Sequence, residues 1–210
     1  MLNISTLVLG LVQTNCYFMS DPKTKSAVVI DPAWDGKYIL KTAEQQGFHI
    51  NQIWLTHAHF DHLGGVAELC NMQTPPPKIA LHEDDMDLWK SQGIAPLFGM
   101  QIDPGPLPDI KLDHGQKLYL GENEFEVFHT PGHTPGHVVY YCRAEAIVFC
   151  GDTIFQGSIG RTDLPGGNYD KLIESIKQFI ITLPDETRLL SGHGPETTVG
   201  EEKLYNPFLI

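Results

Sequence analysis

Residues 56–62 read Thr-His-Ala-His-Phe-Asp-His, a denser group of metal-binding side chains than an ordinary core or surface needs. Imidazole and carboxylate groups are the usual ligands of zinc and related cations. The apolar run at 52–55 predicts a short buried strand before this stretch, and residues 63–69 predict the start of a helix after it. The ligands are therefore expected on a strand-to-helix loop, where α/β sheets place their sites.

The spacing within this stretch predicts two groups of ligands. Alternate side chains of an extended segment share a face, so His57 and His59 can converge on one ion. Asp61 and His62 are offset from that pair and can hold a second ion nearby. The ordinary alternative is a polar loop with solvated histidines, and three further motifs downstream argue against it.

Those three motifs are Pro-Gly-His-Thr-Pro-Gly-His at 131–137, Gly-Asp-Thr-Ile-Phe at 151–155 and Ser-Gly-His-Gly at 191–194. Together with His-x-His-x-Asp-His and the following Gly-Gly, they resemble the signature of the metallo-β-lactamase fold superfamily. The later segments resemble its glyoxalase II-like, or hydroxyacylglutathione hydrolase-like, branch. The motifs occur in the family's order and cover the chain from about residue 27 to residue 194. The resemblance implies an α/β fold, the four-layer αββα sandwich; periodicity alone gives only "α/β or α+β".

The resemblance also implies a site for two metals. The expected ligands are His57, His59 and His133 for one ion, Asp61, His62 and His193 for the other, and Asp152 as a bridge between them. Asp31, which follows a predicted strand, is either a turn residue before proline or a carboxylate that orients a ligand histidine or the metal-bound solvent. Two divalent ions are the expected cofactors, with zinc first and iron or manganese as alternatives, because histidine and carboxylate suit all three.

Two neighbouring residues compete for these positions. His137 repeats the Pro-Gly-His pattern of His133, but it opens a strand and is expected to be packed or to support a ligand. Cys150 stands near Asp152, and true metallo-β-lactamases use a cysteine ligand at the second metal. Because Cys150 ends a predicted buried strand, Asp152 is the expected ligand. Aspartate here favours the hydrolase branch and disfavours a penicillin-cleaving enzyme.

The activity that the resemblance implies is hydrolysis of a thioester. Metal coordination can lower the pKa of water from 15.7 to roughly 7. In the family mechanism, a metal-bridging hydroxide attacks the thioester carbonyl, one metal stabilises the oxyanion and a thiolate leaves. Asp61 and Asp152 are the catalytic candidates, with Asp61 a metal ligand first. The expected partner is a small-molecule thioester, S-lactoylglutathione or a related glutathione thioester.

Arg161 is the candidate for binding the substrate. It falls where glyoxalase II enzymes carry a basic residue that holds a glutathione carboxylate, and guanidinium binds carboxylate in bidentate fashion. The alternative is a structural ion pair with Asp163 or Asp170. The sequence stops soon after His193, so the C-terminal helical domain of the long enzymes is expected to be absent. Residues 1–210 are expected to form a single domain.

The main functional alternative is an oxidoreductase. Persulfide dioxygenases share these motifs, and the run Gly-Arg-Thr-Asp at 160–163 resembles theirs. Such an enzyme would use a single Fe(II) in the region of His57, His59 and Asp152 and consume oxygen with glutathione persulfide. A metal-binding module without catalysis is a third hypothesis, which nothing favours because all seven ligands are present.

Composition narrows the expected partners, the kinds of cysteine site and the cellular location. The net charge of −12 argues against nucleic acid as a partner, since that binding depends on lysine and arginine. The four cysteines show no CxxC pairing, so they signal neither a thiolate zinc site nor a disulfide framework, and a cytoplasmic location is expected. The apolar run at 7–12 follows no basic residue and is too short to span a membrane, so no membrane partner is expected.

Two segments outside the motifs carry further expectations. Residues 83–87, Glu-Asp-Asp-Met-Asp, predict the acidic first turn of a solvated helix rather than a metal site. Residues 93–108 predict a long irregular binding loop, with Phe98 and Met100 as candidates to flank the active-site mouth. Strands are predicted over 4–9, 15–20, 26–30, 78–81, 117–120, 124–129, 138–142, 146–150 and 187–190, and helices over 36–47 and 169–183.

Overall fold

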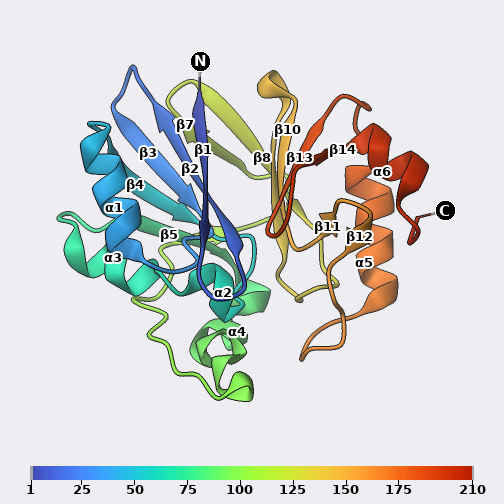
Figure 1. Cartoon of the computed structure of the whole chain (residues 1–210), viewed down its shortest axis with the longest axis horizontal. Coiled ribbons are helices and arrows are strands. Elements are labelled where there is room, and N and C mark those ends of the chain that lie inside the picture. The colour runs from blue at the N-terminus through green and yellow to red at the C-terminus, as the bar shows by residue number, and fades with distance from the viewer. Residues whose placement is uncertain (1, 210) are drawn as a thin grey trace.

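A computed structural model describes residues 2–209. Two six-stranded sheets lie face to face, and helices cover the outer face of each sheet (Figure 1). The apolar side chains accordingly form three clusters, one between the two sheets and one under the helices of each. This arrangement is the four-layer αββα sandwich that the motifs predict.

The first sheet contains the amino-terminal half of the chain. Its strands, in the order in which they pair, are β1 (Asn3–Leu9), β2 (Thr14–Asp21), β3 (Ser26–Ile30), β4 (His49–Trp54), β5 (Lys78–His82) and β6 (Ile110–Leu112). β1 to β3 pair antiparallel, and β3 to β6 pair parallel. The helices α1 (Gly36–Gln45) and α3 (Val66–Met72) cover the outer face and bury Ile39 and Leu69 against Val29 and Ile53 of the sheet.

The second sheet contains the carboxy-terminal half. Its strands, again in pairing order, are β14 (Thr197–Thr198), β13 (Arg188–Ser191), β10 (Ile147–Gly151), β9 (Val138–Cys142), β8 (Asn123–His129) and β7 (Lys117–Leu120). β10 and β13 run parallel and the other neighbours antiparallel. α5 (Tyr169–Ser175) continues as the π-helical segment η4 (Ile176–Ile180), and with α6 (Val199–Tyr205) it covers this sheet (Figure 1).

Aromatic side chains join the two sheets directly below the metal-binding loop. Trp54, the last residue of β4, is fully buried and lies 5.1 Å from Phe125 and 5.4 Å from Tyr140 between ring centroids. The hydroxyl of Tyr140 donates a hydrogen bond to the carbonyl oxygen of Leu55 over 2.6 Å. The second sheet therefore fixes the position at which β4 ends and the loop at 56–62 begins.

The short helix predicted to begin at residue 83 is present as η1 (Glu83–Asp85) followed by α4 (Met86–Lys90). Other elements of two to seven residues were not predicted, because such short stretches carry little readable periodicity. They are β6, β14, α6, α2 (Phe60–Leu63), η2 (Gln92–Phe98), η3 (Arg143–Glu145) and the hairpin of β11 (Ile154–Phe155) with β12 (Ser158–Ile159). The prediction of a wholly irregular segment at 93–108 was wrong at its start, since η2 is helical in part. Among residues 2–209 no helix has the length and apolar character needed to cross a membrane.

We expect Trp54→Ala to lower the free energy of unfolding by about 3–5 kcal/mol, because it removes a fully buried indole from the inter-sheet core. Urea denaturation followed by far-UV circular dichroism measures the loss. Tyr38→Ala is the matched control, since Tyr38 is 52% exposed on α1 and its removal should change stability by less than about 0.5 kcal/mol. Equal losses for the two variants would contradict this account of the core.

Candidate metal centre

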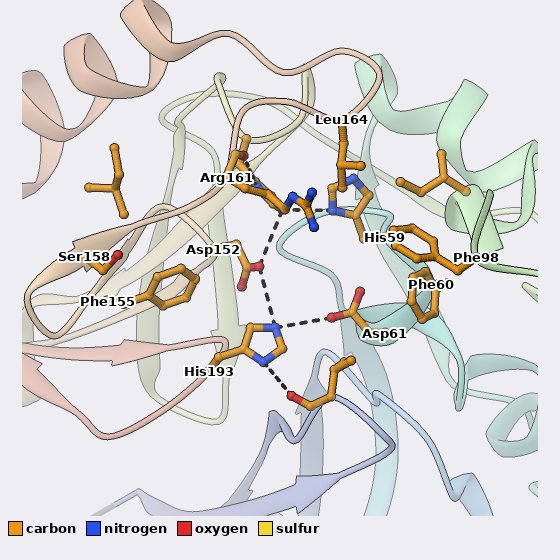
Figure 2. A pocket seen from close by; sticks show the side chains of 14 residues that line it. His59, Phe60, Asp61, Phe98, Asp152, Phe155, Ser158, Arg161, Leu164 and His193 are labelled. Atoms are coloured by element: carbon orange, nitrogen blue, oxygen red, sulfur yellow. Dashed lines mark hydrogen bonds and ion pairs between the residues drawn. The ribbon is translucent and has the colours of Figure 1, made fainter. Parts of the chain in front are cut away.

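The seven predicted ligands meet at one end of the two sheets, where the strands that carry them stop. They are His57 and His59 after β4, Asp61 and His62 in α2, His133 between β8 and β9, Asp152 after β10, and His193 after β13. Figure 2 shows four of these side chains, His59, Asp61, Asp152 and His193, facing a common cleft. Both halves of the chain therefore contribute to one site.

His57, His59 and His133 form the three-histidine cluster. Nδ1 of His59 lies 3.1 Å from Nε2 of His57 and 2.9 Å from Nε2 of His133, and these two Nε2 atoms are 3.2 Å apart. Burial lowers the pKa of all three imidazoles, that of His59 to about 3. Three uncharged nitrogens therefore point at one another, and a cation that accepts all three lone pairs would satisfy them.

Asp61, His62 and His193 form the mixed cluster. Nε2 of His62 lies 3.6 Å from Oδ2 of Asp61, and Nε2 of His193 lies 3.3 Å from the same oxygen. Burial opposes a charge on His62, but the carboxylates of Asp152, Asp61 and Asp31 hold its pKa well above the usual value. Burial likewise opposes a charge on His193, whose pKa is nevertheless raised by Asp61 and Asp152. Without a metal, this cluster is held together by ion pairs that protonated histidines supply.

Asp152 lies between the two clusters. Its Oδ1 is 3.3 Å from Nε2 of His62, and its Oδ2 is 3.5 Å from Nε2 of His133 and 3.6 Å from Nε2 of His193. Burial disfavours the carboxylate, but these histidines together hold its pKa well below the usual value. A Cβ atom at Gly192 would lie 2.2 Å from Oδ1 of Asp152, so this close approach requires glycine.

The polar atoms of the site fit bound cations. Buried side-chain atoms without a hydrogen-bond partner include Nε2 of His62 and Oδ1 of Asp152. Buried polar atoms are normally satisfied, so orphaned atoms gathered in one place indicate a missing partner. The nitrogen and oxygen donors are those that zinc, iron and manganese accept, and the donor set does not distinguish among these metals.

Asp31 connects the two clusters from behind. Its Oδ1 accepts from the backbone N–H of Thr56 over 2.8 Å, and its Oδ2 accepts from Oγ1 of Thr56 over 2.6 Å and from Nδ1 of His62 over 2.9 Å. Oγ1 of Thr56 also lies 3.0 Å from Nδ1 of His57. One carboxylate thus fixes the ring orientation of a histidine in each cluster, the arrangement that a histidine ligand ordinarily needs.

Asp85 is a functional residue that the sequence did not reveal, and the prediction of a solvated helix start was wrong for it. Its side chain is fully buried, whereas Glu83, Asp84 and Asp87 are exposed as expected. Burial raises the pKa of Asp85 to about 6, although hydrogen bonds to the carboxylate oppose this. The position within an acidic run gave no signal of its burial.

The bonds of Asp85 tie two ligand loops together. Oδ2 accepts from the backbone N–H of Ala58 over 2.9 Å and from Oγ1 of Thr134 over 2.8 Å, and Oδ1 accepts from the backbone N–H of Gly136 over 2.6 Å. Ala58 stands between His57 and His59, and Thr134 follows His133. Asp85 therefore sets the distance between the loops that build the three-histidine cluster.

The start of β2 holds the loop that carries His193. Nδ2 of Asn15 donates to the carbonyl oxygens of Ser191 and Gly194, each over 2.9 Å, and the Tyr17 hydroxyl donates to Ser191 O over 2.7 Å. Nδ1 of His193 donates to the carbonyl oxygen of Val12 over 3.2 Å. Sequence reasoning also missed this anchor, although an asparagine directly before the apolar run at 16–19 was a usable signal.

His137 and Cys150, the sequence alternatives to His133 and Asp152, lie outside both clusters. His137 is fully buried, its Nε2 accepts from the backbone N–H of Asp152 over 3.0 Å, and its Nδ1 lies 3.0 Å from Oγ1 of Thr130. Both of its nitrogens are therefore used within the protein, in the supporting position that was expected. The buried thiol of Cys150 donates to the carbonyl oxygen of Val148 over 3.5 Å, and burial raises its pKa.

A cleft of about 400 Å³, here called the metal cleft, opens over the two clusters. Its walls are largely apolar, and they include Val12, Phe60, Ile94, Phe98, Phe155, Ile159 and Leu164. Phe98 lines the metal cleft as predicted, while Met100 is not among its lining residues. Figure 2 shows Phe60, Phe98 and Leu164 on the side of His59, and Phe155 and Ser158 across from them.

Arg161 also lines the metal cleft, but its guanidinium is paired within the chain. Nε lies 2.8 Å from Oδ1 of Asp163 and Nη2 lies 2.7 Å from Oδ2. This is the ion pair that the sequence offered as the alternative to substrate binding. Both side chains are more than half exposed, so solvent screens the pair and it is weak.

Comparison with known proteins agrees with this geometry. The family model of the metallo-β-lactamase superfamily matches residues 9–193, a range that contains all seven ligands. The chain belongs to the metallo-β-lactamase superfamily. Among curated members, hydroxyacylglutathione hydrolase GloC of Haemophilus influenzae is 36% identical over 210 residues, which cover 99% of this chain and 98% of GloC. Probable metallo-hydrolase YqgX of Bacillus subtilis is 39% identical over 206 residues, covering 96% and 94% of the two chains.

Solved structures of the superfamily show the same fold. The B3 metallo-β-lactamase BLEG-1 is similar with a TM-score of 0.91 and 39% identity, over 99% of both chains. TTHA1623 in a di-iron-bound form is similar with a TM-score of 0.89 and 40% identity, over 98% of this chain and 100% of that one. The superfamily and its metallo-hydrolase character are thus established.

We expect the two clusters to differ in the pH dependence of metal affinity. The histidines of the three-histidine cluster have lowered pKa values and are already neutral, so a metal there displaces few protons. His62 and His193 have raised pKa values, so below those values a metal must displace their protons. Affinity of the mixed cluster should fall by up to about tenfold per pH unit and per displaced proton as the pH is lowered through this range.

Isothermal titration calorimetry with zinc at several pH values, in buffers of different ionisation enthalpy, measures both affinity and proton release. His193→Ala should reduce the number of protons released on filling the mixed cluster. Parallel pH dependence of the two binding steps would contradict the assigned charge states.

Asp85→Asn should weaken metal binding chiefly at the three-histidine cluster. The amide has one acceptor oxygen and an NH₂ group that must face other donors, so the variant should also lose about 1–3 kcal/mol of stability. Elemental analysis at limiting zinc and chemical denaturation measure the two effects. Asp84→Asn, at the exposed neighbouring residue, is the matched control and should change neither. Full zinc content at limiting metal in Asp85→Asn would show that the loops do not depend on this carboxylate.

Proposed function

We propose that the protein is a metal-dependent thioester hydrolase that acts on S-lactoylglutathione or a related glutathione thioester. The observation that carries the proposal is the placement of Asp152, whose two oxygens face a three-histidine cluster on one side and a mixed cluster on the other. The likeness to GloC along nearly the whole of both chains supports the same substrate class.

The chain's own residues would divide the work as follows. Two divalent cations, which we propose to be zinc, supply Lewis acidity and lower the pKa of coordinated water. The seven ligands hold them, and Asp31 and Asp85 keep the ligand loops in register. Asp61 and Asp152 have lowered pKa values and stay ionised at neutral pH, so both can act as anionic ligands. A thiolate is a good leaving group, so no dedicated general acid is required.

The position of Arg161 supports the proposal that the substrate carries an anionic group. Among the described residues that line the metal cleft, Arg161 is the only lysine or arginine. Its ion pair with Asp163 is exposed and therefore weak. A substrate carboxylate can therefore replace Asp163 on the guanidinium with the same bidentate geometry. The glutathione arm would then lie along the 160–163 segment, with the thioester carbonyl over the clusters.

Two other activities are less well supported. Hydrolysis of β-lactams is suggested by the likeness to BLEG-1, and the apolar walls of the metal cleft do not exclude such a substrate. Oxygen-dependent oxidation of glutathione persulfide, the alternative from sequence, would use a single iron and leave Asp61, His62 and His193 without a role. A complete second ligand set therefore favours hydrolysis.

We expect protein loaded with two zinc ions to release thiol from S-lactoylglutathione. Arg161→Ala should lower kcat/KM by roughly ten- to a hundredfold through KM, with metal content unchanged, because a charged contact to substrate is lost. Asp163→Asn is the matched control, since it frees the guanidinium and should leave KM equal or lower. Thiol release measured with a chromogenic disulfide decides these points. Turnover of a cephalosporin or of glutathione persulfide, with none of any glutathione thioester, would overturn the proposal.

A further inference from the structure

A second cavity of about 490 Å³, here called the outer cavity, opens next to the metal cleft. Its apolar lining comprises Leu88, Ile94, Pro96, Leu97, Pro135 and Pro165. Ile94 lines both the outer cavity and the metal cleft. Two pairs of consecutive residues are divided between the cavities. Leu97 lines the outer cavity and Phe98 the metal cleft, while Leu164 lines the metal cleft and Pro165 the outer cavity. A thin apolar ridge, with Ile94 at its centre, separates the two.

The backbone at this ridge is strained. Ile94 has φ of 62° and ψ of 12°, a left-handed conformation that a β-branched residue rarely adopts. Gly93 before it has φ of 58°, and a Cβ atom there would lie 2.4 Å from the backbone nitrogen of Phe60. Oε1 of Gln92 accepts from the N–H of Ile102 over 3.0 Å and fixes the turn from the other side. Strain that the surroundings maintain in this way is typical of sites where the position of a side chain matters.

The charges around the outer cavity disfavour anionic ligands. Its polar rim carries the carboxylates of Asp84 and Asp87, and its lining residues include neither lysine nor arginine. Arg161, the partner for a substrate carboxylate, lines the metal cleft instead. The anionic glutathione arm is therefore repelled from the outer cavity, whereas an uncharged apolar group is accepted by it. Leu97, 65% exposed beside this opening, extends the apolar surface outward.

We propose that the outer cavity binds the aliphatic acyl chain of a glutathione thioester, so that the protein prefers medium-length acyl groups to the lactoyl group. The acyl chain crosses the ridge at Ile94 while the glutathione arm stays near Arg161. Hydrolysis breaks the carbon–sulfur bond: water supplies one oxygen of the new carboxylate, one of its protons goes to the departing thiol, and the other is released to solvent. This inference rests on the proposed thioester hydrolysis and adds the substrate class.

Steady-state kinetics on S-acetyl-, S-hexanoyl- and S-octanoylglutathione, with S-lactoylglutathione for comparison, tests the inference. We expect kcat/KM to rise about two- to fourfold per methylene until the chain fills the outer cavity. Leu97→Asp adds a charge to the rim at an exposed position and should lower the octanoyl-to-acetyl ratio by about tenfold or more. Leu107→Asp is the matched control: Leu107 is 66% exposed, lines neither cavity and should leave that ratio unchanged.

Binding of S-octylglutathione, a thioether that cannot be hydrolysed, separates this inference from the proposed function. If short thioesters are turned over but chain length and Leu97→Asp have no effect, the acyl site is wrong and the hydrolase stands. If no thioester is turned over but S-octylglutathione binds more tightly than S-methylglutathione, and Leu97→Asp weakens that binding, the acyl site stands and the hydrolase fails. Equal affinity for both thioethers would overturn the acyl site whatever the catalytic result.

Discussion

The buried carboxylate of Asp152 is the constraint on which the site depends. A negative charge taken out of water is costly unless positive partners surround it, and Asp152 finds them in His62 and His193, whose pKa values are raised. Its low pKa means that the charge persists at all ordinary pH values, so the loops must either supply protonated imidazoles or share metal ions. Charge balance thus constrains how the ligand segments that follow β4, β10 and β13 approach one another.

The sandwich and the site use different forces. Apolar clusters between and outside the sheets fix where each strand ends, and Trp54 illustrates this at the start of the metal-binding loop. Beyond the strand ends, buried hydrogen-bonding groups take over: Asp31, Asp85 and Asn15 each join segments far apart in the chain. Because the hydrogen bonds of these three residues hold the loops in place, the loops can be irregular while their ligand atoms stay close to one another.

Much of this could be predicted from the sequence, because the information was local. The ligand motifs occupy short contiguous stretches, and the strand at 26–30 and the paired strands at 138–142 and 146–150 follow directly from their apolar runs. Asp85 could not be predicted, since only the tertiary structure brings Ala58 and Gly136 to it. The pairing of Arg161 with Asp163 was an open alternative, as a spacing of two residues permits but does not require it. The outer cavity has no sequence signature, because its walls come from four separate segments.

The anchoring of the His193 loop by β2 has a consequence for how the protein is made. Asn15 and Ser191 are separated by 176 residues in the chain, so their contact forms only after both segments have been synthesised. Until that contact forms, Asp61 and His62 lack the third side chain of the mixed cluster, because His193 lies two residues beyond Ser191. Long-range contacts of this kind also slow folding, because a large loop must close before they form. The mixed cluster would therefore be completed late in folding, once β2 has captured the loop that carries His193.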